Sequence, residues 1–209
     1  MVQAKGVGAK VAILTKPALR TKILAARRAL TERERATETR SLQRQITELT
    51  AGAGTVGAYI PVGSEPGAAR GSVPLLDGLI GVRILVPIAR TGRPLQWAEY
   101  RSGELVAAPF GLREPPPPWL APEAIAEATV LLVPALAVDH QGNRLGRGAG
   151  FYDRALPLAA AGARRVAVVR DDELLDVVPA EPHDVPMTHA LTPGRGLIPL
   201  GRADGDDRE

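Results

Sequence analysis

The sequence contains no cysteine among its 209 residues. Disulfide bonds, thiolate metal sites and cysteine nucleophiles are therefore excluded. A chain without cysteine suits a reducing compartment, and we expect a cytoplasmic protein.

Long hydrophobic runs are also missing. No stretch approaches the ~18 apolar residues that a membrane-spanning helix requires. The segment Met1–Leu14 lacks the apolar block of a secretory signal. We expect a soluble, unprocessed chain that does not enter a membrane.

Aromatic residues are scarce, at 3% of the chain, although hydrophobic residues reach 45%. The core must therefore consist mainly of Leu, Val, Ile and Ala, as in sheets whose strands are aliphatic runs. A chain of this length buries one core more readily than two. We expect one domain over residues 15–202, between a flexible extension at 1–14 and a polar tail at 203–209. We also expect a monomer.

Positive and negative charges are nearly balanced, because the chain contains 26 Lys and Arg and 23 Asp and Glu. The basic residues concentrate between Lys16 and Arg44, with almost no aromatic residues for stacking on bases. Such a cluster is usually the solvated face of a helix. Nucleic-acid binding is therefore disfavoured, although it stays an open alternative.

Two helices are predicted at the start of the chain. Leu19, Ile23, Ala26 and Leu30 recur at helical spacing, while Arg20, Arg27 and Arg28 fall elsewhere on the helical wheel. The sequence from Thr31 to Glu34 has the form of a capping box and predicts the start of a second helix.

Short aliphatic runs bounded by Pro or Gly predict strands at 55–60, 82–86, 94–100, 130–133 and 165–169. Helical character is expected at 75–80 and 152–161. Residues 103–118 contain four consecutive prolines and predict a surface loop. This alternation is typical of an α/β fold, which we predict to be a single-domain three-layer sandwich: a mostly parallel sheet flanked by helices, with an N-terminal helical pair.

The segment from Asn143 to Asp153 is rich in glycine and arginine. Glycines let the backbone approach a ligand closely, and Arg144 and Arg147 add permanent positive charge. These features describe a phosphate cradle. The spacing fits neither the dinucleotide fingerprint nor the P-loop. The ordinary alternative is a strand-to-helix connection with solvent-facing arginines.

Three further residues are candidates for a site. Asp153 could coordinate Mg²⁺, or could only add favourable charge to the first turn of a helix. Tyr152 is equally compatible with a ligand contact and with packing. Glu65 follows a strand at the place where open α/β sheets bind ligands, and it could accept hydrogen bonds from a pterin-like ring. The lone histidines are expected to be structural or surface groups.

The segment Asn143–Arg154 resembles the signature of the 5-formyltetrahydrofolate cyclo-ligases. Four other segments resemble this family in the expected order, so that the resemblance extends from Lys16 to Thr192. These segments are Lys16–Arg20 followed by Arg27, Tyr59–Glu65, Phe110–Pro115 and Glu181–Asp184.

The resemblance implies a site for ATP, Mg²⁺ and a folate. It implies Arg147 and Tyr152 as catalytic residues, Ile60 and Glu65 as folate contacts, and Asp153 as a metal ligand. The ATP contacts that it implies are Lys16, Pro17, Ala18, Leu19, Arg20, Arg144, Leu145, Gly146, Arg147, Gly148, Ala149, Gly150, Phe151 and Tyr152.

The resemblance also implies a reaction. In this family ATP phosphorylates the formyl oxygen of 5-formyltetrahydrofolate, N10 of the folate then attacks the formyl carbon, and phosphate leaves as 5,10-methenyltetrahydrofolate forms. Both nucleophiles belong to substrates, so positioning and charge neutralisation are the tasks of the protein. The open alternatives are a non-catalytic folate-, nucleotide- or RNA-binding relative and an ATP-dependent kinase or ligase for another small molecule.

Two departures from the family pattern stand out. The family often has a threonine where this chain reads Pro66-Gly67-Ala68, and commonly has a metal-binding aspartate where Thr188 is expected to align. Asp184 or water could replace that second ligand.

Overall fold

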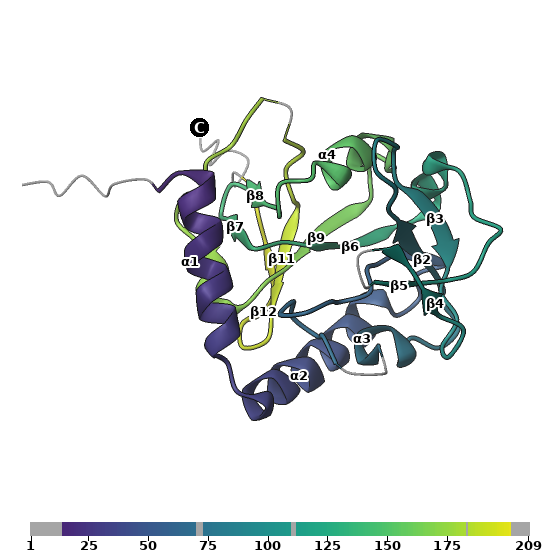
Figure 1. The fold of residues 1–209 in the computed structure, drawn as a ribbon, viewed down its shortest axis with the longest axis horizontal. Coiled ribbons are helices and arrows are strands. Elements are labelled where there is room, and N and C mark those ends of the chain that lie inside the picture. Colours follow the sequence, from purple (N-terminus) through teal and green to yellow (C-terminus); the bar gives the residue numbers. More distant parts are fainter. Residues whose placement is uncertain (1–13, 70–72, 110–111, 183, 202–209) are drawn as a thin grey trace, which may run out of the picture.

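A seven-stranded sheet forms the centre of the computed structural model, which describes residues 14–69, 73–109, 112–182 and 184–201. The strand order is β12-β11-β9-β6-β1-β2-β3 (Figure 1). The five inner strands are parallel, whereas the edge strands β3 and β12 are antiparallel to their neighbours. The strands of this sheet are β1 (Thr55–Gly57), β2 (Arg83–Ile88), β3 (Gln96–Glu99), β6 (Val130–Pro134), β9 (Arg164–Val168), β11 (His189–Thr192) and β12 (Gly196–Pro199).

The order of the strands creates a switch point at the middle of the sheet. After β1 the chain adds β2 and β3 on one side, and it then returns to place β6 and β9 on the other side of β1. The connections on the two sides therefore diverge between β1 and β6. Open α/β sheets bind ligands in the crevice that such a divergence leaves at the carboxyl ends of the strands.

The predicted helical pair is confirmed as α1 (Lys16–Ala29) and α2 (Glu32–Thr50). The hydroxyl of Thr15 accepts from the amide of Ala18, and Thr31 and Glu34 form the predicted capping box. These side chains satisfy amide groups that the first turn of a helix leaves without partners.

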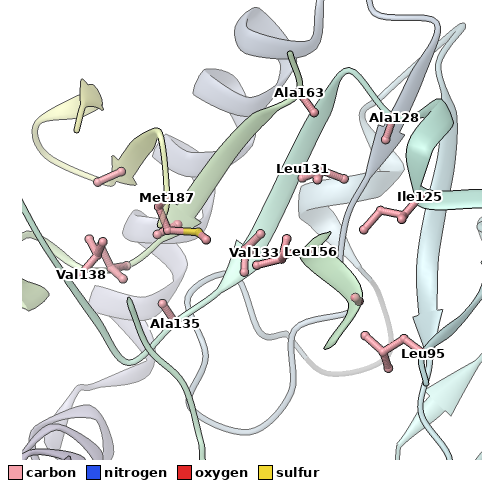
Figure 2. Close-up of a cluster of buried hydrophobic side chains, with 14 of the residues drawn as sticks. Leu95, Ile125, Ala128, Leu131, Val133, Ala135, Val138, Leu156, Ala163 and Met187 are labelled. Carbon is pink, nitrogen blue, oxygen red and sulfur yellow. The ribbon is translucent and has the colours of Figure 1, made fainter. Parts of the chain in front are cut away.

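Alternate residues of the strands face opposite layers, which confirms the three-layer prediction. Ile84 and Val86 belong to one cluster with Leu42 and Ile46 of α2, whereas Leu85 belongs to the cluster on the other side. That second cluster includes Val133 of β6 and Leu156, which lie side by side in Figure 2. The short helical segments that complete the layers are α3 (Pro74–Asp77), η2 (Pro122–Glu127), α4 (Phe151–Ala155), η3 (Leu156–Leu158) and η4 (Asp171–Glu173).

Two predicted helices are much shorter than expected. The helix predicted at 152–161 ends at Ala155 and continues only as the turn η3, because Pro157 has no amide hydrogen and its ring crowds the preceding turn. The helix predicted at 75–80 is the single turn α3, which Gly78 ends. The predicted loop at 103–118 also contains two paired segments, β4 (Val106–Ala107) and β5 (Arg113–Glu114).

A small second sheet was not predicted. It consists of β7 (Ala137–Asp139), β8 (Arg144–Leu145) and β10 (Leu174–Leu175), in the order β10-β7-β8. Leu19 and Ile23 of α1 pack against Leu136 and Leu145 in this region. The first helix therefore covers the small sheet and not the central one. No helix within the described residues is long and apolar enough to cross a membrane.

Four buried or half-buried charges connect the helical pair to the end of β9. Arg27 of α1 binds both carboxylate oxygens of Glu173, with distances of 2.6 Å from Nε and 2.7 Å from Nη2. Arg170 lies 3.9 Å from Glu173 and 2.8 Å from Glu38 of α2. Positive and negative charges alternate through the network, so each one has an opposite neighbour.

We expect Glu173→Gln to lower the free energy of unfolding by about 3–5 kcal/mol, because it leaves the buried charge of Arg27 without its counter-ion. Urea denaturation measures this change. Glu127→Gln is the control, since Glu127 pairs with Arg83 at an exposed position and its loss should cost less than about 1 kcal/mol. Equal losses in the two variants would contradict the structural role of the buried pair.

Candidate active site

A cavity of about 310 Å³ opens at the switch point of the sheet. Its walls come from the carboxyl ends of β1, β2 and β6, from the β4–β5 region and from the glycine-rich loop. The lining residues fall in the segments 59–65, 87–95, 108–109, 112–114, 134–136 and 144–153, with Arg27 added from α1. The segments that the sequence marked separately as a phosphate cradle and a folate contact thus share one cavity.

The glycine-rich loop lies against two arginines. Gly148 has a φ of +102°, and a Cβ there would lie 3.4 Å from the guanidinium carbon of Arg20. A Cβ at Gly146 would lie 2.8 Å from Nη1 of Arg144. Nε of Arg20 also donates to the carbonyl oxygen of Gly146 at 2.9 Å. The missing side chains let both guanidinium groups approach the backbone of the loop.

An ion pair closes this loop at its base. Nη2 of Arg144 lies 2.6 Å from Oδ1 of Asp153, and Nη1 donates to the carbonyl oxygen of Pro134 at 3.3 Å. The same guanidinium lies 5.7 Å from the centre of the Tyr152 ring. Arg144 is only 7% exposed. Its main role is therefore to hold Asp153 in place, and its charge is not free to bind a ligand.

Glu65 joins the loop to the end of β1. Its Oε2 accepts from the amide of Val62 at 2.9 Å, and its Oε1 lies 3.1 Å from Nε of Arg147. Burial raises the pKa of Glu65, while the Val62 amide and Arg147 oppose this shift. Arg147 remains 51% exposed, so it can reach outward to an anion.

Tyr152 packs against the core and also lines the cavity, so its predicted ligand contact stays a prediction. Its ring packs against the core cluster of Figure 2, and its hydroxyl is buried without a hydrogen-bond partner among the described residues. Burial and the charge of Glu65 raise the pKa of Tyr152. The phenol therefore keeps its proton at neutral pH and can serve as a hydrogen-bond donor.

Several predicted nucleotide contacts lie outside the walls of the cavity. Nζ of Lys16 lies 3.0 Å from Asp184 and 3.5 Å from Glu181. Leu19 and Leu145 are buried together in the cluster beneath α1. Pro17 and Ala18 form the first turn of that helix, so Arg20 is the member of the Lys16–Arg20 segment that contacts the loop.

Thr188 does not occupy a position near the loop. Its hydroxyl donates to the carbonyl oxygen of Arg165 and accepts from the Arg165 amide, at the amino ends of β9 and β11. The cavity lies at the carboxyl ends of the parallel strands, so Thr188 is not placed to contribute to a metal site there. Asp184 and Glu181 both lie beside Lys16 at the start of α1.

Sequence reasoning missed several groups that shape the cavity. Arg27, which was quoted for the resemblance but was given no role in the site, lines the cavity together with Arg90. Arg90 pairs with Glu114, and its guanidinium lies 4.4 Å from the centre of the Trp119 ring. Glu114 belongs to the segment that resembled the family turn, which offered the one signal for this contact. Phe110, Gly111 and His183, also quoted for the resemblance, lie outside the described residues.

Asp139 is a second group that was missed. It is 1% exposed and accepts hydrogen bonds from the amides of Gln141, Asn143 and Val178 and from Nδ2 of Asn143. The carboxylate thus holds the turn between β7 and β8, from which the glycine-rich loop departs. Asn143 of the signature has a structural role in this turn.

The sequence profile of the 5-formyltetrahydrofolate cyclo-ligase family matches residues 12–193. The chain belongs to this family. It is 58% identical over 193 residues to the 5-formyltetrahydrofolate cyclo-ligase of Mycolicibacterium smegmatis, a match that covers 89% of this chain and 97% of the relative. The enzyme of that name from Escherichia coli K12 is 30% identical over 128 residues, or 58% of this chain and 70% of the relative.

Solved structures of the family share the fold. A 5,10-methenyltetrahydrofolate synthetase from Aquifex aeolicus superposes with a TM-score of 0.72 at 25% identity, covering 94% of this chain and 97% of the other. A 5,10-methenyltetrahydrofolate synthetase from Mycoplasma pneumoniae reaches 0.64 at 19% identity, covering 83% and 96%. The predicted family, fold and enzyme class are confirmed.

The raised pKa of Glu65 gives a prediction about pH. The folded chain binds this proton more tightly than the unfolded chain, so the associated stability is complete at low pH and is lost as pH rises through the raised pKa. We expect the wild type to lose stability relative to Glu65→Gln as pH rises from about 4 to about 8. Urea denaturation across this range measures the difference, and a constant difference would contradict the shift.

Proposed function

We propose that the chain converts 5-formyltetrahydrofolate to 5,10-methenyltetrahydrofolate, with hydrolysis of ATP to ADP and phosphate and with a requirement for Mg²⁺. The observation that carries this proposal is the shared cavity, in which the arginine- and glycine-rich loop meets Glu65 at the switch point of the sheet. Membership of the cyclo-ligase family supports the reaction type.

The chemistry needs no nucleophile from the protein. The formyl oxygen accepts the terminal phosphoryl group of ATP and ADP leaves. N10 of the same folate then forms a bond to the formyl carbon, and the C–O bond breaks to release phosphate. The protein has to hold the two substrates in line and to neutralise the charge of the transferred group.

One end of the cavity suits the folate. Its walls carry mostly apolar side chains, among them Ile60, Pro87 and Leu95, which can cover the faces of a flat ring. Glu65 supplies an acceptor for ring N–H groups, and the buried hydroxyl of Tyr152 supplies a donor. A buried donor that keeps its proton can bind an oxygen on which negative charge develops.

The other end suits a polyphosphate. Arg147 is half exposed beside Glu65, whereas Arg20 is held against the loop by the carbonyl oxygen of Gly146. Guanidinium groups bind phosphate oxygens with two parallel hydrogen bonds. The glycines of the loop leave its backbone open to the same ligand.

The residues present fit a Mg²⁺ ion that is bound mainly by phosphate oxygens. Oδ1 of Asp153 is engaged with Arg144, while Oδ2 makes no hydrogen bond within the described chain and is left as a metal ligand. No group of three or more acidic or histidine side chains that could hold a metal occurs in the described part of the chain. A bound Mg²⁺ would neutralise phosphate charge, as it does where one or two carboxylates and a nucleotide share the ion.

Three arginines of the basic helical pair are engaged inside the protein, which weakens the case for an RNA-binding role. Arg20 bonds to the glycine-rich loop, Arg27 is buried, and Arg35 donates to the carbonyl oxygens of Arg27 and Leu30. These three guanidinium groups serve internal contacts and are not free for phosphate groups of a nucleic acid. The exposed basic residues of the pair are Lys22, Arg28, Arg33, Arg40 and Arg44.

The direct test is the absorbance of the methenyl product after purified protein is mixed with 5-formyltetrahydrofolate, ATP and Mg²⁺. We expect product only in the complete mixture, with omission of ATP or Mg²⁺ as controls. Folded protein that binds ATP yet forms no product would contradict the proposal and would favour another small-molecule substrate.

We expect Arg147→Ala to raise the apparent KM for ATP by roughly tenfold or more, because a charge-assisted hydrogen bond to phosphate is lost. Arg154→Ala is the matched control. It removes an arginine of α4, just after the loop, whose guanidinium lies over the Phe151 ring and donates to the carbonyl oxygen of Ala149. Steady-state kinetics with varied ATP measure both, and equal KM values for the two variants would contradict the role of Arg147.

A further inference from the structure

Arg27 is a buried charged residue in the wall of the cavity. The fold and the proposed reaction explain only some of the hydrogen-bonding groups of its guanidinium. Arg27 is 1% exposed. Nε and Nη2 bind the carboxylate of Glu173 at 2.6 and 2.7 Å, and Nη2 also donates to the carbonyl oxygen of Ala135 at 2.7 Å. Nη1 is buried without a hydrogen-bond partner among the described residues.

A buried N–H donor without an acceptor lowers the stability of the folded chain, because its lost hydration is not replaced. Buried polar groups nearly always have partners, and a donor on a charged group loses more on desolvation than a neutral one. Glu173 and Ala135 hold the guanidinium plane in place, so Nη1 cannot turn to another acceptor without breaking two short contacts. A group that enters the cavity is therefore the natural acceptor for its N–H.

The charges around Arg27 restrict the chemistry of that acceptor. Glu173 already neutralises the guanidinium, and the carboxylate of Glu65 lies in the same cavity. A second anion would be repelled by both carboxylates. The acceptor should therefore be a neutral oxygen, and the same ligand should carry N–H groups for Glu65.

We propose that Arg27 donates Nη1–H to the ring carbonyl oxygen of the pteridine, while Glu65 accepts from the N–H groups on the same edge of the ring. This inference rests on the proposed function, since it assumes that a reduced folate occupies the cavity. Arg27 is then a specificity-determining residue that selects a ring with a carbonyl oxygen. It takes no part in phosphoryl transfer.

The experiment measures binding of two ligands by calorimetry in the absence of ATP. One is 5-formyltetrahydrofolate, and the other is its analogue with an amino group in place of the ring carbonyl oxygen, which presents a donor to Arg27. We expect the wild type to prefer the carbonyl ligand by about tenfold or more, the effect of one hydrogen bond to a charged group. A wild type without this preference would overturn the proposal and needs no variant to do so.

The double variant Arg27→Met/Glu173→Leu tests whether the preference comes from Arg27. Replacement of both partners leaves no unpaired buried charge, so the fold should survive. We expect the preference to fall by about tenfold. The matched control is Glu38→Leu/Arg170→Met, which removes the other pair of the same network and should keep the wild-type preference.

The outcomes separate this inference from the function on which it rests. A preference that is unchanged in Arg27→Met/Glu173→Leu overturns the role of Arg27, even if the wild type forms the methenyl product. Failure of the wild type to bind or convert 5-formyltetrahydrofolate overturns the proposed function, and the inference with it.

Discussion

The ion pair between Arg27 and Glu173 lies where three parts of the chain meet. Arg27 comes from α1, Glu173 from the turn after β9, and the carbonyl oxygen of Ala135, which Arg27 also binds, from the end of β6. A buried pair of this kind adds little net stability, but it penalises any arrangement that separates its charges. It therefore fixes the position of α1 along the small sheet. Arg20 lies about two turns earlier on the same helix and is thereby held against the glycine-rich loop.

The loop itself depends on a second set of contacts. Asp139 fixes the turn before it, and the pair of Arg144 and Asp153 closes its base. Gly148, with a φ of +102°, is needed because most residues avoid this conformation. A site for phosphate groups must present its donors without rearrangement, since only preorganised groups stabilise a transition state at low cost. The rigid base and the half-exposed Arg147 divide these tasks between a fixed frame and one adjustable side chain.

The sequence predicted α1 and α2 because each carries a long helical period, and it predicted β1, β2, β3, β6 and β9 from short aliphatic runs. It did not predict β11 and β12. It did not reveal the small sheet, since strands of two or three residues leave no period to detect. Arg27 shows the same limit for the site. On the helical wheel it was assigned to the polar face, yet its spacing from Leu19 and Ile23 places it on the buried face of α1. Its partner Glu173 is remote in the sequence, so the sequence pattern does not reveal which carboxylate neutralises the buried guanidinium. Glu65 and the glycine-rich loop could be identified because each belongs to a motif that is visible in the sequence. Their contact through Arg147 could be seen only in the structure.

The pairing of charges gives the cavity two chemically different ends. Arg27, Arg90 and Arg144 each have a carboxylate partner, in Glu173, Glu114 and Asp153. Arg147 pairs with Glu65, which also accepts a hydrogen bond from the amide of Val62. Arg20 makes no ion pair within the described residues. Uncompensated positive charge therefore lies beside the glycine-rich loop, whereas the walls near Arg27 are neutral overall. An anion would be attracted to the first region, and a neutral ring would meet no electrostatic penalty in the second. Under the proposed function the first region therefore suits the polyphosphate and the second suits the pteridine ring.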